Sequence, residues 1–341
     1  MGYLAKRKHE ERERYLLISL LMLIPLVTLL GTLGRSLDWR LDYLGEFKVQ
    51  AALLSGLLVF WCLFRKRWYA AVLFFVLALF NLALVSSRYH LSEKESSLPP
   101  DAHVFSLLYQ DLKGADEKAP EIRAVMDNAD ADVVLWTNVP VDIYRRLNEI
   151  KGAYTLQNQS LDKHGHMMLI LARSPSTGRG LIPGNAGIWL SRVIGTRKLT
   201  VVLTSLVNPW SEEGYAAAQE KVAHLADFVR GRDEPVVLAG GFGAAAWSYL
   251  LKDLETEGGL DPKGTVALTY PAGLPVFMRR PTDHIYTHPG IEVSDLQTTE
   301  SIGTERLGLT AEVKIAPERK EVEFYELQPI LPEEELLAEP L

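Results

Sequence analysis

The first quarter of the chain contains three long apolar runs without a charged residue, and these constrain the fold more than any other feature. They cover residues 15–33, 49–64 and 68–86. About 20 apolar residues in a helix cross the hydrocarbon core of a bilayer; the second run reaches that length only if Phe47 and a snorkelling Lys48 extend it. The alternatives are three core helices of a soluble protein, or a cleaved signal peptide in place of the first run. Because uncharged runs of this length are rare in soluble cores, we predict three transmembrane helices within residues 15–86.

The placement of lysine and arginine predicts how these helices are oriented. Residues 1–14 carry five basic side chains from Lys6 to Arg14, and the turn at residues 65–67 reads Arg-Lys-Arg. Basic loops stay preferentially in the cytoplasm. We therefore predict a multi-pass protein of the plasma (inner) membrane with a cytoplasmic N-terminus, so that the 34–48 loop and everything after residue 86 are extracytoplasmic. Arg35, Arg40 and Lys48 in the outer loop weaken this bias.

The net charge argues against a nucleic-acid-binding function, and the cysteine content excludes an intramolecular disulfide. The net charge is −7 and the isoelectric point is about 5.7, whereas nucleic-acid-binding domains are normally basic. Nucleic acid is therefore not an expected partner. The only cysteine, Cys62, lies in an apolar run, so no intramolecular disulfide can form.

Residues 102–316 are predicted to form one α/β (α+β) domain. A polar linker ending in two prolines, residues 87–101, precedes it, and an acidic, proline-punctuated tail, residues 317–341, follows. Strand patterns without intervening helices in the middle of the domain favour two packed mixed β-sheets flanked by helices. The expected strands are residues 104–109, 132–137, 153–159, 166–172, 188–194, 199–206, 236–238, 284–287 and 309–315, and the expected helices are 120–126, 141–150, 213–229 and 244–251.

The stretch 236–248, VVLAGGFGAAAWS, has the form of a strand, a glycine turn and a helix. It resembles the Gly-Asp-Phe-Asn-Ala motif of the endonuclease/exonuclease/phosphatase family, with Gly241 in place of Asp and Gly243 in place of Asn. The resemblance extends over residues 103–315 and implies a four-layer αββα sandwich.

The other motifs of that family occur in the same order. Gln110, followed by Asp111, replaces the Asn that ends the first strand, and Asn138 replaces the metal-binding Glu of the second motif. Ser205 replaces the His of Thr-His-Leu. The Thr-Tyr-Pro at 269–271 and the Asp283-His284-Ile sequence are retained, whereas the final Ser-Asp-His-x-Pro has become 304–308, with Glu305 and Arg306.

These replacements imply that the family's chemistry is lost. Its phosphoester hydrolysis requires a divalent cation held by carboxylates and a base that activates water. Asn138 and Gly241 supply no carboxylate, Ser205 is a poor base, and Arg306 stays protonated. We therefore expect no intact catalytic set, no cofactor and no turnover, because groups that act as a unit fail together.

The sequence predicts a membrane-anchored, catalytically inactive member of this family that acts as a binding or scaffolding module. Besides the lipid bilayer, its expected partner is a protein or an anionic ligand. Arg279, Arg280 and Arg306 are candidate contacts for an anion, and the alternative is that they form a solvated run of charge. One alternative is an active Mg- or Mn-dependent phosphodiesterase or phosphatase with a rearranged site built from Asp111, Asp283, His284 and Glu305. Another is a structural subunit of a membrane complex.

Overall fold

The computed structural model describes residues 2–86, 98–161, 165, 167–206, 208–261 and 266–317, with side chains from Glu11 onward. The predicted tail lies outside this range except for Pro317, and most of the predicted linker lies outside it as well. The boundaries proposed for these two segments therefore stay predictions.

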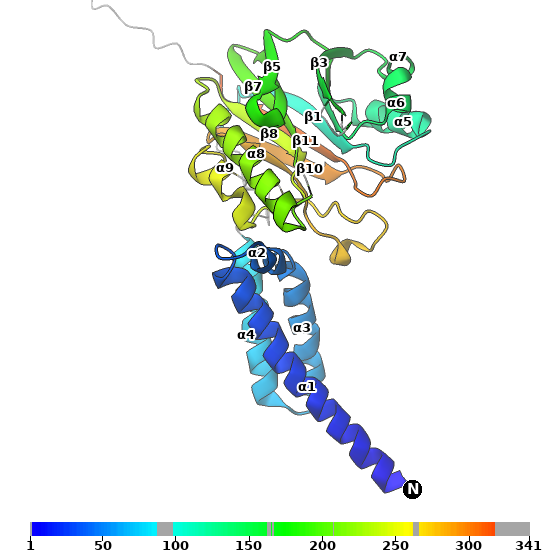
Figure 1. The fold of residues 1–341 in the computed structure, drawn as a ribbon, viewed down its shortest axis with the longest axis vertical. Helices are drawn as coiled ribbons and strands as arrows, with labels where there is room; N and C mark the ends of the chain where they lie inside the picture. The colour runs from blue at the N-terminus through cyan, green and yellow to red at the C-terminus, as the bar shows by residue number, and fades with distance from the viewer. Residues whose placement is uncertain are drawn as a thin grey trace, which may run out of the picture.

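The N-terminal helices form an elongated bundle below the rest of the molecule (Figure 1). They are α1 (Gly2–Leu33), α2 (Trp39–Gly45), α3 (Lys48–Phe64) and α4 (Trp68–Ser86). Two of them, over Glu11–Leu33 and Trp68–Ser86, are long and apolar enough to cross a membrane; α2 and α3 meet at a 51° bend and give a third if the bent pair counts as one span. Most large apolar side chains of these helices point outward, which suits a lipid environment.

Helix α2 was not predicted, because residues 34–48 were expected to be a loop. Its N-cap is Asp38, whose side chain accepts a hydrogen bond from the Arg40 amide. Its end crosses α1 where two glycines meet: a Cβ on Gly31 would lie 2.6 Å from the backbone nitrogen of Gly45. This close approach folds α2 across the top of the bundle.

Above the bundle lie two packed mixed sheets, as predicted. The first has the order β10-β11-β1-β2-β4-β3 and the second β5-β6-β7-β8-β9. The strands are β1 (His103–Asp111), β2 (Val133–Thr137), β3 (Thr155–Leu161), β4 (Met167–Ala172), β5 (Gly178–Ile182), β6 (Gly187–Ile194), β7 (Arg197–Ser205), β8 (Val236–Gly241), β9 (Asp283–Thr287), β10 (Ile291–Thr298) and β11 (Leu309–Ile315). Within each sheet one pair is parallel, β1 with β2 and β7 with β8, and the other pairs are antiparallel.

Helices cover the outer face of each sheet, which confirms the four-layer sandwich. Alternate strand residues such as Leu107, Leu135, Val201 and Ala239 form the core between the sheets. The outer face of the first sheet packs against α5 (Ala119–Ala129), α6 (Val141–Arg145) and α7 (Leu147–Ile150). The second sheet packs against α8 (Glu212–Arg230) and α9 (Lys252–Thr256), and three short 3₁₀ turns, η1 (Pro183–Asn185), η2 (Tyr249–Leu251) and η3 (Val276–Met278), complete the elements.

Several sequence predictions need correction. The helix expected over 244–251 is absent: residues 244–248 form turns, and only η2 and α9 are helical. The helix over 141–150 is split into α6 and α7, and strands β5 and β10 were not predicted. The prediction for the alanine-rich segment was wrong because contacts with a distant part of the chain decide its conformation: Ala245, Ala246 and Trp247 pack with Val85 of α4.

The domain is docked on the bundle through α2. The buried carboxylate of Asp42 accepts hydrogen bonds from Ser248 Oγ at 2.6 Å, from the amides of Tyr249 at 2.8 Å and Leu250 at 3.1 Å, and from Tyr215 Oη at 3.2 Å. Trp247 Nε1 donates to the Gly45 carbonyl at 2.8 Å. These bonds fix the end of the domain that lies next to the N-terminal helices.

Candidate active site

The predicted site residues gather at one rim of the sandwich because strands of both sheets end there. The parallel pairs β1–β2 and β7–β8 end at Asp111, Thr137, Ser205 and Gly241. Strand β9 runs antiparallel to β8, so its first residue, Asp283, pairs with Gly241 at the same rim. The carboxyl ends of parallel strands are where open α/β sheets place their ligands.

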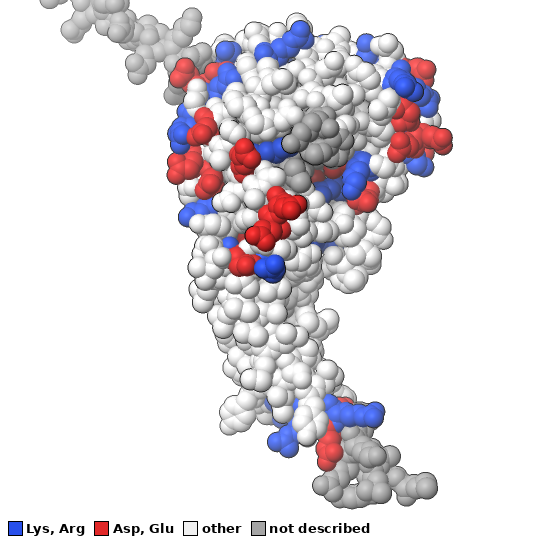
Figure 2. All heavy atoms as spheres, viewed as in Figure 1, with Lys and Arg blue, Asp and Glu red and all other residues white. Residues whose placement is uncertain are grey.

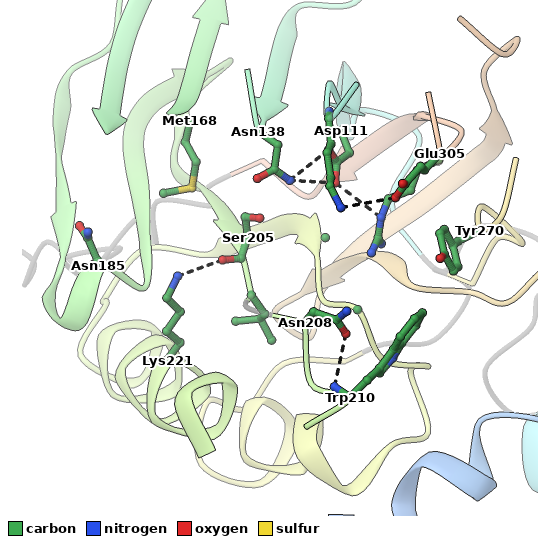
Figure 3. A pocket seen from close by; sticks show the side chains of 15 residues that line it. Asp111, Asn138, Met168, Asn185, Ser205, Asn208, Trp210, Lys221, Tyr270 and Glu305 are labelled. Atoms are coloured by element: carbon green, nitrogen blue, oxygen red, sulfur yellow. Dashed lines mark hydrogen bonds and ion pairs between the residues drawn. The ribbon is translucent and has the colours of Figure 1, made fainter. Parts of the chain in front are cut away.

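An open cleft of about 540 Å³ lies at this rim (Figure 3). Its walls combine cationic, amide, aromatic and acidic side chains that come from both sheets, from α8 and from the loops. The lining residues are Asp111, Lys113, Asn138, Met168, Asn185, Ser205, Leu206, Asn208, Trp210, Lys221, Gly241, Gly243, Tyr270, Glu305 and Arg306.

Arg306 connects the two acidic residues at the base of the cleft. Its Nη1 donates to Asp283 Oδ1 at 3.0 Å, and its Nε lies 3.5 Å from Asp111 Oδ2. Burial alone would lower the pKa of Arg306, but the Asp283 and Asp111 carboxylates raise it overall. The guanidinium therefore stays charged and offsets part of the negative charge of the buried acidic pair.

Asp283 is fully buried and its lone pairs are occupied. Thr269 Oγ1 and Thr282 Oγ1 both donate to Oδ2, the latter at 3.0 Å. Tyr109 Oη donates to Oδ1 at 3.3 Å. With Arg306 also on Oδ1, this carboxylate has four hydrogen-bond donors.

Asn138 covers the other carboxylate. Its Nδ2 lies 3.0 Å from both Oδ1 and Oδ2 of Asp111. Its backbone adopts a positive φ of 52°, which asparagine tolerates better than most residues. Burial raises the pKa of Asp111, Asp283 raises it further, and Arg306 opposes both. The amide therefore presents its donor, not its carbonyl oxygen, to the acidic residue.

Gly241 faces the same cluster and has no room for a side chain. A Cβ there would lie 2.8 Å from Tyr109 Oη and 3.3 Å from Asp283 Oδ1. Burial raises the pKa of Tyr109 well above its ordinary value, so the phenol stays neutral. The Tyr109 hydroxyl thus fills the space next to Gly241.

The remaining predicted positions divide between cleft and core. Ser205, Gly243 and Glu305 line the cleft, and Glu305 lies 3.5 Å from Lys113 Nζ. Gln110 and His284 do not line it, because side chains alternate along strands. Gln110 accepts from Thr299 on the outer face, and His284 Nε2 lies 2.8 Å from the Ala244 carbonyl, beside Phe242 and Tyr286.

The side chains present do not fit a divalent cation. Among the described residues, no group of three His, Cys, Asp or Glu side chains is placed to hold one. Asp111 and Asp283 already share the positive charge of Arg306, and that charge weakens their attraction for a metal ion. His284 and Glu305 do not join them.

Sequence reasoning missed several residues of the cleft wall and of the buried layer beneath it, among them Tyr109, Lys221 and Trp210. Tyr109 shares a strand face with Asp111, two residues later, so alternation along β1 could have found it. Lys221 reaches the cleft from α8 and donates to the Ser205 carbonyl at 3.1 Å, and Trp210 comes from the loop before that helix. For these two, no local sequence pattern marks a side chain that reaches the rim from another layer.

Comparison with known proteins gives a family match. The sequence model of the "Endonuclease/Exonuclease/phosphatase family" matches residues 108–304. No curated protein matches the chain.

Solved structures with the same fold include an endonuclease/exonuclease/phosphatase from Bacteroides vulgatus, with 12% identity, a TM-score of 0.52, and coverage of 62% of this chain and 99% of that chain. An AP endonuclease from Archaeoglobus fulgidus matches with 11% identity, a TM-score of 0.51, and coverage of 61% and 98%. A humanized D. rerio TDP2 matches with 11% identity, a TM-score of 0.50, and coverage of 62% and 98%. At these identities the likeness concerns the fold alone.

Proposed function

Because the chain belongs to the endonuclease/exonuclease/phosphatase family, we propose that its domain is a non-hydrolytic member, anchored in the membrane, that binds an anionic ligand in the rim cleft. The helices hold the domain at the bilayer, and the cleft offers the binding surface. Phosphoester cleavage is not part of this function.

One observation carries the proposal: Arg306 is the counter-ion of both buried carboxylates, at 3.0 Å from Asp283 and 3.5 Å from Asp111. A family enzyme that needs a divalent cation would use such carboxylates as ligands. Here a cation belonging to the chain itself takes that electrostatic role. Gly241 next to them adds no ligand, and Tyr109 leaves no space for one.

The cleft walls support binding of an anion. Lys221 and Lys113 contribute positive charge, while Asn138, Asn185 and Asn208 contribute amides. Trp210 and Tyr270, whose ring centroids are 6.0 Å apart, form an aromatic side. A phosphate group attached to a planar or apolar body matches this combination of charge, hydrogen-bond donors and ring faces.

The hydrolysis test uses the full chain in nanodiscs with Mg²⁺ or Mn²⁺ and a panel of phosphodiesters: bis-p-nitrophenyl phosphate, abasic-site DNA and a phosphoinositide. We expect turnover no higher than that of Asp283→Asn, which removes one buried carboxylate with little change of shape. Asp227→Asn, an exposed position on α8, is the matched control. Metal-dependent turnover that is present in the wild type and the control but absent in Asp283→Asn would establish an active, rearranged site and refute the proposal.

The binding test titrates inorganic pyrophosphate and a nucleoside triphosphate into the same preparation. Saturable binding should weaken about tenfold in Lys221→Met, which corresponds to roughly 1.4 kcal/mol. Lys252→Met, on α9 away from the cleft lining, should bind as the wild type does. Absence of saturable binding, or equal affinity of Lys221→Met and Lys252→Met, would refute the claim that the cleft binds an anion.

A further inference from the structure

We propose that the loop over residues 271–279 inserts its apolar tip into the bilayer interface, as a second membrane contact besides the helices. The loop connects Tyr270 at the cleft with Arg280, whose guanidinium pairs with Glu46 just after α2. Its partner is the lipid surface that surrounds the N-terminal end of α3.

The apolar side chains at the tip of the loop are exposed. Val276, Phe277 and Met278 in η3 are 58%, 56% and 49% exposed, and Leu274 is 38% exposed. The four side chains belong to one five-residue segment without a charge. Contiguous exposed apolar side chains of this kind mark an interaction surface.

The loop lies beside the N-terminal end of α3. Gln50, in the first turn of α3, donates from Nε2 to the Arg279 carbonyl at 2.9 Å, and η3 lies against α3. Figure 1 shows the loop in gold, hanging from the underside of the domain at the level of α2 and the upper end of α3. In Figure 2 the surface of this projection is uncharged on the side shown and adjoins the uncharged surface of the bundle. The apolar tip therefore lies at the depth where α3 enters the membrane.

Several polar groups of the loop are hydrogen-bonded within it. Arg279 folds back, donating from Nε to the Leu274 carbonyl at 2.7 Å and from Nη2 to the Ala272 carbonyl at 3.0 Å. The Met278 amide donates to the Pro275 carbonyl at 2.9 Å. Unpaired backbone groups are costly in lipid, and these bonds reduce that cost while the apolar side chains point outward.

These arguments select the bilayer over a protein partner. The patch is continuous with helices that are apolar enough to span a membrane, and a lipid surface is present beside α3 in every copy of an inserted chain. Tyr270, immediately before the loop, lines the cleft. Insertion would therefore hold the mouth of the cleft close to the lipid headgroups.

The experiment places an environment-sensitive NBD probe at Phe277→Cys in a Cys62→Ala background, with the full chain at one copy per nanodisc. Leu181→Cys on β5 is the matched control, because Leu181 is also apolar and 59% exposed but lies at the end of the domain far from the helices. A second probe at Met278→Cys guards against a local defect at position 277.

Nitroxide-labelled lipids with the label near the headgroup should quench both loop probes at least threefold more than the Leu181 probe, with blue-shifted emission. Equal quenching at the loop and control positions would overturn the proposal. Blue-shifted emission at the loop without lipid-dependent quenching would also overturn it, because the tip would then be covered by protein.

Discussion

At the scale of single residues, the base of the cleft is organised around buried charge. Two carboxylates this close would repel each other strongly in a medium of low dielectric constant. Arg306, Asn138 and the threonines around Asp283 offset that repulsion with charge-assisted hydrogen bonds. The cluster is a self-contained network, so changing one member alters the others.

Gly241 and Tyr109 test this dependence. Gly241→Ala should destabilise the domain by roughly 1–3 kcal/mol, because the new Cβ would lie 2.8 Å from Tyr109 Oη in a packed interior. Thermal unfolding of the full chain in detergent, followed by domain-specific hydrogen exchange, measures the change.

The matched comparison is Gly241→Ala in a Tyr109→Phe background, where the hydroxyl is gone. We expect the alanine to be tolerated there with a loss several-fold smaller. Equal losses in the two backgrounds would mean that the Tyr109 hydroxyl does not limit position 241.

The sequence was sufficient to predict which residues lie at the strand ends of the rim. It was not sufficient to predict which side chains those residues contact. The positions of Asn138, Ser205, Gly241 and Asp283 follow from motif order, and all lie at the rim. The pairing of Arg306 with two carboxylates depends on how the loop between β10 and β11 places this side chain against both β1 and β9, and no local pattern encodes that placement.

At the scale of elements, α2 is the joint between bundle and domain. Its Asp42 accepts two backbone amides at the start of η2, and Glu46, just after the helix, pairs with Arg280 at 2.6 Å. Arg280 also lies over the rings of Trp210 and Tyr270, which line the cleft. Helix α2 is therefore connected to the cleft through Arg280 and through Tyr43, whose ring centroid lies 5.8 Å from that of Trp210.

Removing the α2 contact should loosen the joint. In Asp42→Ala the Tyr249 amide loses its side-chain acceptor and the Leu250 amide keeps only Ser248 Oγ. The Tyr249 amide should therefore exchange with deuterium at least tenfold faster, equivalent to about 1.4 kcal/mol of local opening, and the Leu250 amide should exchange faster by a smaller factor. Hydrogen-exchange mass spectrometry on the full chain in nanodiscs gives the rate.

Asp38→Ala is the control, because the Asp38 side chain caps the start of α2 and accepts from Arg40, within the same helix end. It should leave exchange at residues 249–250 nearly unchanged. Similar acceleration in both variants would show that α2 stability, and not the Asp42 contact, protects these amides.

The same contact explains why the helix predicted over 244–251 is absent. An alanine-rich segment has high helix propensity, yet tertiary packing overrides it here. Ala245, Ala246 and Trp247 pack against the bundle, and Asp42 takes amides that a continuous helix would have used internally. A partner about 200 residues away cannot be read from local sequence. The long apolar runs, by contrast, predicted their helices because length and hydropathy alone decide them.

At the scale of the whole molecule, an uncharged zone lies between two charged parts along the long axis. Figure 2 shows an uncharged zone on the bundle, with Lys and Arg at the end far from the domain. That end carries the 65–67 turn, where Arg65 pairs with Glu13. We propose that the basic end is cytoplasmic and that the domain is extracytoplasmic.

Single-cysteine labelling tests this orientation in the Cys62→Ala background. A membrane-impermeant maleimide should label Leu181→Cys in intact spheroplasts, and Lys66→Cys only after the membrane is permeabilised. The reverse pattern would place the domain in the cytoplasm.

Manganese binding tests most directly whether Arg306, instead of a metal ion, offsets the negative charge of Asp111 and Asp283 in the cleft. Electron paramagnetic resonance of Mn²⁺ titrated into the full chain in nanodiscs measures bound metal without requiring turnover. We expect the wild type and Asp111→Asn to give the same titration, because the cleft carboxylates bind no Mn²⁺ in either protein. A bound Mn²⁺ signal in the wild type that disappears in Asp111→Asn would contradict it.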